Sequence, residues 1–288
     1  MTTSTSQLPD RVYRAMTDDG SFRVVTLRAT QTVAGVLKSQ RVDPATARHL
    51  GDLVIGSVLI RETMSPALRV QGLLKREGRA GYLLGDSHPS GRARGLAAIQ
   101  RESGPFEMQG AVLQMMRTLQ DGRVQQGVVA VPDGADVSRA LMTYMQESEQ
   151  ITTMIVVCTQ LNGDEVTAAG GYLLQLLPKA ERGPLAVMAE RLDDFRDIDK
   201  LVASTDFTPG ALCSELLWGM PYTPLEESEF AYGCWCSRTS MLGAVASLGR
   251  GDIQEMVDAG EVLDIQCDYC GENYRLPPNE LVGLLDDN

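Results

Sequence analysis

The feature that constrains this chain most is a set of four cysteines near its C-terminal end. One residue separates Cys234 from Cys236, and two residues separate Cys267 from Cys270. The first spacing places both side chains on one face of an extended strand, and the second, followed by Gly271, predicts a tight turn. Around a tetrahedral Zn²⁺ with Zn–S bonds of about 2.3 Å, sulfurs lie about 3.8 Å apart, which both arrangements allow. We therefore predict one Zn²⁺ per chain, bound by Cys234, Cys236, Cys267 and Cys270, with an iron–sulfur cluster as the alternative.

The residues around these cysteines, 234–288, predict a small metal-binding module. An apolar stripe over residues 241–248 predicts one short helix. Asp252 and Glu255 have the pattern of a capping box at the start of a second helix, which ends at Gly260, and residues 262–267 have the pattern of a strand. So small a module has too little core to fold alone. Metal binding would then supply its folding free energy, on the order of 10–16 kcal/mol for structural zinc.

Residues 1–178 predict an α+β core domain with a largely antiparallel sheet and core helices. The strand-like stretches are 21–30, 68–74, 111–119, 124–131, 154–157 and 172–177. Asp121-Gly122 and Asn162-Gly163 are turn signals between successive strands. Asp43, followed by Pro44, predicts the start of one amphipathic helix, and a second helix begins at Asp136.

Residues 179–233 predict a helical linker between the core domain and the metal module. Its apolar positions recur at helical spacing among charged neighbours, and they include Leu185, Met188, Leu192 and Phe195. Thr208-Pro209 predicts the start of another helix, which stops near Gly219. Such an apolar stripe must be covered, either by the core domain or by a partner, and packing on the core domain is the simpler interpretation.

Charge argues against two classes of partner. The formal net charge is −12, and from residue 231 onward three arginines face ten carboxylates. Because nucleic acid and anionic membranes would repel such a surface, we expect neither as a partner. The first ten residues lack the basic and apolar regions of a signal peptide, and no apolar run is long enough to span a bilayer. We therefore expect a cytoplasmic protein.

Little in the sequence supports an enzyme. The two histidines are His49, within the first predicted helix, and His88, in a loop-like segment, so a catalytic pair has no support. Gly170-Gly171 is not followed by the residues of a phosphate-binding loop. Cys158 lies in an apolar stretch of strand length, so we expect it to be an inert core residue. Cys213 lies in the linker and has no assigned role.

Several motifs resemble one family, the 33 kDa heat-shock redox chaperones, also called the 33 kDa chaperonins. The similarity includes Cys-X-Cys-Ser-Arg at 234–238 and Cys-Asp-Tyr-Cys-Gly at 267–271, with 30 residues between Cys236 and Cys267. It extends to Gln-Gly-Val-Val at 126–129, Ser-Glu-Gln at 148–150 and Ala-Ala-Gly-Gly-Tyr-Leu-Leu-Gln at 168–175. The resemblance therefore covers nearly the whole chain.

This resemblance implies a chaperone that holds unfolding client proteins without ATP and is inactive while reduced and zinc-bound. It implies that peroxide or hypochlorite forms the disulfides Cys234–Cys236 and Cys267–Cys270, releases zinc and unfolds the module and linker. The stripe of Leu185, Met188, Leu192 and Phe195 would then bind clients, and the oxidised form would be a homodimer. The residues alone leave a second hypothesis open, a binding or scaffold protein whose zinc ribbon is purely structural.

Overall fold

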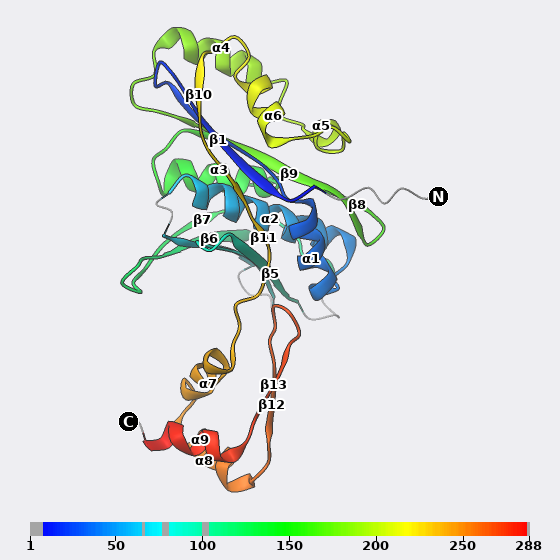
Figure 1. The fold of residues 1–288 in the computed structure, drawn as a ribbon, viewed down its shortest axis with the longest axis vertical. Coiled ribbons are helices and arrows are strands. Elements are labelled where there is room, and N and C mark those ends of the chain that lie inside the picture. The colour runs from blue at the N-terminus through cyan, green and yellow to red at the C-terminus, as the bar shows by residue number, and fades with distance from the viewer. Residues whose placement is uncertain (1–7, 65–66, 77–80, 100–103, 287–288) are drawn as a thin grey trace. The chain divides into compact units, whose positions relative to one another are not determined.

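Two units make up the chain in the computed structural model, residues 1–233 and residues 234–288. The structure describes residues 8–64, 67–76, 81–99 and 104–286. The N-terminal residues 1–7, on which part of the signal-peptide argument rests, lie outside the described residues. The elements of each unit are labelled in Figure 1.

One antiparallel sheet of the first unit has the strand order β10-β1-β2-β9-β8. Its strands are β1 (Arg11–Thr17), β2 (Phe22–Arg28), β8 (Thr153–Asn162), β9 (Glu165–Leu176) and β10 (Tyr222–Glu229). We call it sheet A. The predicted strands at 21–30, 154–157 and 172–177 are confirmed, and the Asn162-Gly163 turn joins β8 to β9.

The other sheet, sheet B, has the order β11-β5-β4-β3-β6-β7, and only β11 and β5 pair in parallel among its described strands. Its strands are β3 (Arg69–Arg76), β4 (Tyr82–His88), β5 (Arg92–Ala98), β6 (Ala111–Thr118), β7 (Val124–Ala130) and β11 (Ala231–Tyr232). The predicted hairpin around Asp121-Gly122 joins β6 to β7, and Gly122 has a φ of 81°. The α+β class with antiparallel sheets is therefore confirmed.

Three helices fill the space between the two sheets (Figure 1): α1 (Thr30–Gln40), α2 (Pro44–Glu62) and α3 (Val137–Glu147). The predicted helix starts are confirmed. The Asp43 carboxylate accepts hydrogen bonds from the backbone N–H groups of Ala45 and Thr46, and Asp136 accepts one from Arg139. Such caps satisfy N–H groups that have no partner within the helix.

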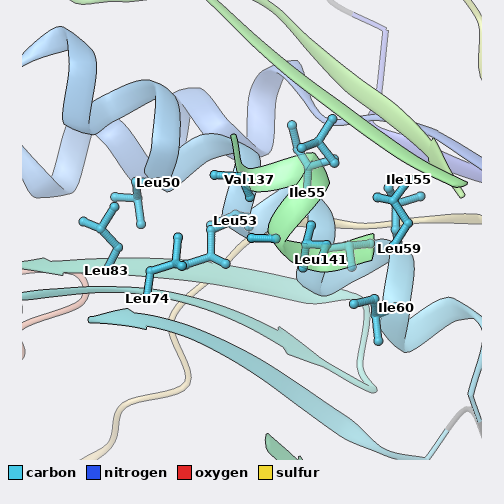
Figure 2. Packing of buried hydrophobic residues seen from close by; sticks show 14 of the residues in the cluster. Leu50, Leu53, Ile55, Leu59, Ile60, Leu74, Leu83, Val137, Leu141 and Ile155 are labelled. Carbon is cyan, nitrogen blue, oxygen red and sulfur yellow. The ribbon is translucent and has the colours of Figure 1, made fainter. Parts of the chain in front are cut away.

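The core of the first unit forms around α2, which is buried along most of its length. Figure 2 shows Leu50 and Leu53 of α2 above Leu83 and Leu74 of sheet B, with Ile55 on the other side of the helix. These five side chains are fully buried. Because α2 contacts both sheets, it is apolar around most of its circumference, as expected of a central helix.

A row of glycines lets α2 lie close to sheet B. Gly72, Gly85 and Gly95 are direct neighbours on β3, β4 and β5. A Cβ atom at Gly85 would lie 2.7 Å from the carbonyl oxygen of Leu53, and one at Gly95 would lie 3.0 Å from Val54 Cγ2. The small residues therefore set the distance between helix and sheet.

The linker contains α4 (Arg182–Leu192), α5 (Asp199–Val202) and α6 (Pro209–Leu216), which cover the face of sheet A opposite α1–α3 (Figure 1). Thr208 accepts a hydrogen bond from the Ala211 N–H and Pro209 follows it, as predicted for the start of α6. Met188, Leu212 and Leu216 are buried in a second apolar cluster with side chains of sheet A. The apolar stripe thus packs on the core domain.

One part of the linker prediction is wrong, because residues 222–229 form strand β10 and not a helix. This strand pairs with β1 at both of its ends, with a register shift between Tyr13 and Ala15. Arg11 forms an ion pair with Glu229 at 2.8 Å, and Arg14 donates to the carbonyl of Glu226 at 3.0 Å. An exposed edge strand needs no alternation of apolar residues, so the usual sequence signal of a strand is missing here.

The second unit contains α7 (Arg238–Ala246), α8 (Arg250–Ala259), β12 (Leu263–Gln266), β13 (Asn273–Leu276) and α9 (Pro278–Asp286). The antiparallel hairpin of β12 and β13 is its only sheet within the described residues. Its small apolar core consists of Val245, Ile253, Leu276, Leu281 and Leu285. The predicted helix end at Gly260, with a φ of 67°, and the predicted strand at 262–267 are confirmed.

Two local predictions for this unit are wrong. Asp252 and Glu255 form no capping box, because α8 begins earlier and has Gly249 at its N-cap. Cys234 and Cys236 lie in an irregular segment after β11 and not within a strand. A capping box does form at α7. The Ser237 side chain accepts a hydrogen bond from the Ser240 backbone N–H, and the Ser240 side chain accepts one from the Ser237 backbone N–H.

Candidate metal centre

Four sulfur atoms converge in the second unit. The Sγ atoms of Cys234, Cys236, Cys267 and Cys270 all lie within 4.8 Å of one another. Cys234 and Cys267 are 3.8 Å apart, and Cys236 and Cys270 are 3.5 Å apart. These distances are close to the sulfur–sulfur edge of about 3.8 Å expected around tetrahedral zinc. The sequence predicted this set of residues, and the fold places them in one cluster.

The hairpin between β12 and β13 positions Cys267 and Cys270. The Cys267 N–H donates to the Glu272 carbonyl, and the Gly271 N–H donates to the Cys267 carbonyl, both at 2.8 Å. Gly271 has a φ of 77°, a left-handed conformation that favours glycine. The backbone N–H groups of Cys270 and Tyr269 also point to the Cys267 sulfur. The result is a tight turn that directs both thiols to one side.

The segment that carries Cys234 and Cys236 is fixed from its C-terminal side. Ser237 caps α7, which begins at Arg238. The Arg238 guanidinium forms an ion pair with Glu280 on α9 and also donates to the carbonyl of Arg275 on β13, at 2.7 Å. These contacts hold the start of α7 against the hairpin, and Cys236 lies only two residues before Arg238.

A side chain also contacts one of the sulfurs directly. The Tyr274 hydroxyl, on β13, donates to Cys236 Sγ at 3.1 Å. This hydrogen bond, together with burial, raises the pKa of Tyr274, so its hydroxyl keeps its proton and remains a donor. Sequence reasoning missed this residue, because 38 positions separate the two and only the fold brings them together.

The donor set suits a soft divalent cation. Burial raises the pKa of the Cys270 thiol, and the adjacent sulfurs of Cys236, Cys234 and Cys267 act in the same direction. Burial likewise raises the pKa of Cys267. Four close thiolates repel one another and therefore need a compensating positive charge. Zinc bound by four thiolates provides that compensation, and the residues fit it.

The other two cysteines lie outside the cluster. The Cys158 thiol donates to Asp199 Oδ1 at 3.0 Å, and burial raises its pKa. Burial raises the pKa of Cys213 to about 12. Both thiols are therefore protonated and weakly nucleophilic at neutral pH. His49 and His88 belong to no cluster of metal-ligating groups among the described residues.

The four residues predicted to bind clients differ in exposure. Met188 is buried, with 1% of its surface exposed, and Leu185 is 41% exposed. Leu192 and Phe195 are partly buried against the apolar cluster of sheet A and the linker. Tyr172 of β9 donates its hydroxyl to the Phe195 carbonyl at 2.9 Å, which fixes the end of this stripe to sheet A.

Known proteins match both the sequence and the fold. The family model described as Hsp33 protein matches residues 10–277. The 33 kDa chaperonin of Syntrophotalea carbinolica is 26% identical over 96% of this chain and 100% of its own length. The 33 kDa chaperonin of Shouchella clausii is 27% identical over 97% of this chain and 98% of its own length. The crystal structure of the 33 kDa chaperonin from Thermotoga maritima gives a TM-score of 0.81 at 21% identity, covering 97% of this chain and 98% of that one. None of the described helices is long and apolar enough to span a membrane.

Proposed function

The chain belongs to the Hsp33 family, and on that premise we propose that it is a redox-regulated, ATP-independent chaperone that holds unfolding proteins under oxidative stress. Its curated relatives are named 33 kDa chaperonin, which supports the chaperone role. The observation that carries the redox part is the cluster of four sulfurs within 4.8 Å in a unit with a small core. In this proposal one Zn²⁺ per chain is bound by Cys234, Cys236, Cys267 and Cys270.

Bound zinc keeps the four sulfurs as thiolates, the form that oxidants attack, and supplies folding free energy to the unit. In the proposed switch, each cysteine pair gives two electrons to one peroxide molecule. One S–S bond forms, the O–O bond breaks, and two protons from solvent complete two water molecules. Sulfurs joined in disulfides are no longer thiolate ligands, so the oxidised unit would not hold Zn²⁺. Oxidation thus converts the ligand set into the disulfides Cys234–Cys236 and Cys267–Cys270.

We expect disulfides within each short segment, because unfolding would separate the two segments from each other but not the two cysteines within one segment. In the folded unit, contacts across the two segments are as short as 3.5 Å, between Cys236 and Cys270. Those contacts depend on the folded unit, whereas the sulfurs within each segment stay near each other because few residues separate them. As the unit loses zinc and its structure, only the near-neighbour pairs remain close.

Release of the linker helices would create the client-binding surface. Helices α4–α6 are attached to sheet A mainly by side-chain packing, while β10 is bonded to β1 along its backbone. Detaching these helices would expose Met188, Leu192 and Phe195, together with Phe22 and Tyr172 beneath them. Leu185, which is already exposed, would extend this apolar surface. Such a surface suits the apolar segments of unfolding proteins.

The remaining features of the proposal concern partners and location. The partners are unfolded or partly folded proteins and, after oxidation, a second copy of the chain. The net charge of −12 supports the exclusion of nucleic acid and membranes as partners, and we place the protein in the cytoplasm without an enzymatic activity. The alternative is a binding or scaffold protein whose zinc ribbon is purely structural.

One experiment separates these two functions. The zinc-loaded, reduced protein is treated with peroxide at mildly raised temperature. Zinc release, thiol loss and suppression of aggregation of a denatured client are followed in the same sample. The chaperone proposal predicts that all three rise together and that a thiol reductant with added zinc reverses them. Loss of zinc and thiols without any suppression of aggregation would leave the structural ribbon as the better account.

A further inference from the structure

Tyr274 connects the two halves of the cysteine cluster. It lies on β13, opposite Ile265 of β12, in the hairpin whose turn carries Cys267 and Cys270. Its hydroxyl donates to the sulfur of Cys236, which comes from the other segment. The contact is therefore a link between the hairpin and the Cys234–Cys236 segment that depends on a single hydroxyl group.

We propose that Tyr274 is a positioning residue of the zinc site, which holds the Cys236 thiolate in its ligand geometry and slows its oxidation. This inference rests on the proposed zinc-binding redox switch. Outer-shell hydrogen bonds orient metal ligands, and their removal typically costs about 10- to 100-fold in metal affinity. Because the donor here is an uncharged phenol, we expect the loss of zinc affinity to lie at the lower end of that range.

The effect on oxidation follows from the charge on sulfur. A hydrogen bond to a thiolate draws electron density from the lone pairs that attack an oxidant, and nucleophilicity falls with it. When the Cys236 thiolate attacks peroxide, an S–O bond forms, the O–O bond breaks and hydroxide leaves. The Cys234 thiolate then displaces a second hydroxide from that sulfur and forms the S–S bond, and both hydroxides take protons from solvent. The Tyr274 hydroxyl opposes the first of these steps.

The contacts around Tyr274 allow its hydroxyl to be removed without disturbing the hairpin. The ring belongs to a four-residue strand whose backbone pairs with β12 from Leu263↔Leu276 to Gln266↔Asn273. Independently of the phenol, Arg238 joins the Cys236 segment to the hairpin through the Arg275 carbonyl and to α9 through Glu280. Tyr274→Phe therefore removes the donor while the ring, the strand pairing and the Arg238 contacts remain.

The test compares full-length Tyr274→Phe with the wild type and with Tyr222→Phe. The control removes a hydroxyl from a tyrosine on β10, where it contacts Ser214 at 2.8 Å outside the cysteine unit. Zinc affinity is measured by competition with a chromophoric chelator, and alkylation of each cysteine by mass spectrometry. In the cobalt(II)-substituted protein, the thiolate-to-cobalt charge-transfer band reports the electron density on sulfur.

For Tyr274→Phe we expect roughly tenfold weaker zinc binding, faster zinc loss with peroxide, and faster alkylation of Cys236 relative to Cys270. We also expect the cobalt band to move to longer wavelength, whereas Tyr222→Phe changes none of these.

Equally faster alkylation of all four cysteines would overturn the proposal, because it would indicate a loosened unit. Unchanged alkylation ratios and an unchanged cobalt band would also overturn it. If these readouts change as expected while the oxidised wild type suppresses no aggregation, the chaperone proposal fails and the role of Tyr274 stands.

Discussion

Arg238 and Glu280 form a two-point ion pair that fixes the cysteine segment beside α9. The distances are 2.8 Å from Arg238 Nε to Glu280 Oε2 and 2.6 Å from Nη2 to Oε1. The hydrogen bond from Arg238 lowers the pKa of Glu280, so the carboxylate is charged at neutral pH. Because Arg238 follows Cys236 by two residues, this pair restrains one zinc ligand through a short stretch of backbone.

Replacing Glu280 with Gln should weaken zinc binding by about two- to fivefold, which is the scale of an exposed ion pair. The loss should be larger at low salt than at high salt, because ions screen exposed charges. Chelator competition at two salt concentrations measures both effects. Asp264→Asn is the matched control, since its ion pair with Arg275 at 3.2 Å is also exposed but does not involve Arg238. Equal losses in the two variants would show that Glu280 has no special role.

Replacing Cys267 with Ser should abolish stable zinc binding and unfold the second unit even under reducing conditions. Cys267 is the most buried of the four cysteines, at 5% exposure, and its backbone forms the turn that presents Cys270. Loss of one of four ligands removes much of the binding free energy, which is on the order of 10–16 kcal/mol for structural zinc. The measurement is zinc per chain, together with hydrogen exchange over residues 234–288.

The control for that variant is Cys213→Ala. It also removes one thiol, but from the apolar cluster beneath the linker helices. Its zinc content should remain at one per chain, although the first unit should lose some stability through the smaller side chain. A Cys267→Ser protein that still binds one zinc would contradict the ligand assignment.

Local signals in the sequence were sufficient where a few neighbouring residues determine the structure. Asp43 and Asp136 marked helix starts because an N-cap acts within three positions along the chain. Cys267, Cys270 and Gly271 predicted their turn for the same reason. The four cysteines could be grouped because zinc imposes one known geometry on its ligands.

Features that depend on the fold were missed. Strand β10 forms because β1 offers a backbone edge and Arg11 offers charge to Glu229, and neither is visible in the sequence of 222–229. The contact of Tyr274 with Cys236 likewise needs the folded hairpin. Asp252 does not cap α8, because this helix starts at Arg250, earlier than expected, and has Gly249 at its N-cap. Long-range contacts therefore determine strand β10 and the position of Tyr274, which local patterns could not predict.

Two neighbouring residues on α4 allow a matched test of the linker. Met188 has 1% of its surface exposed and packs in the apolar cluster with sheet A, whereas Val187 is 49% exposed. Met188→Ala should weaken the attachment of α4 by about 2–5 kcal/mol, and Val187→Ala should change it by less than about 0.5 kcal/mol. Hydrogen exchange of residues 182–216 in the reduced, zinc-bound protein measures this difference.

If linker release exposes the client surface, Met188→Ala should also suppress client aggregation at a lower peroxide dose than the wild type. Val187→Ala should respond as the wild type does. Increased exchange in Met188→Ala without any change in the peroxide response would separate the linker from the chaperone activity. That result would direct attention to the core domain as the client-binding part.

Asp52 is a half-buried acid of the first unit, on α2, which packs against β8. Its Oδ1 atom is sheltered from solvent and has no hydrogen-bond partner among the described residues. Burial raises the pKa of Asp52 from 3.8 to about 8; Asp136 and Asp199 act in the same direction, and Thr159 and Arg48 oppose it. The carboxyl group is therefore mostly neutral in the folded protein at pH 7.

This raised pKa predicts a pH dependence of stability with a definite sign. Between pH 3.8 and about 8 the folded chain keeps a proton on Asp52 that the unfolded chain has lost. The free energy of unfolding should therefore fall as pH rises through this window, by on the order of a few kcal/mol, and level off above it. Asp52→Asn cannot ionise, so thermal unfolding of this variant from pH 5 to pH 9 should show a flatter profile. Asp164→Asn, at the exposed β8–β9 turn, should keep the wild-type slope. Parallel profiles for wild type and Asp52→Asn would mean that Asp52 is already ionised in the folded protein at neutral pH.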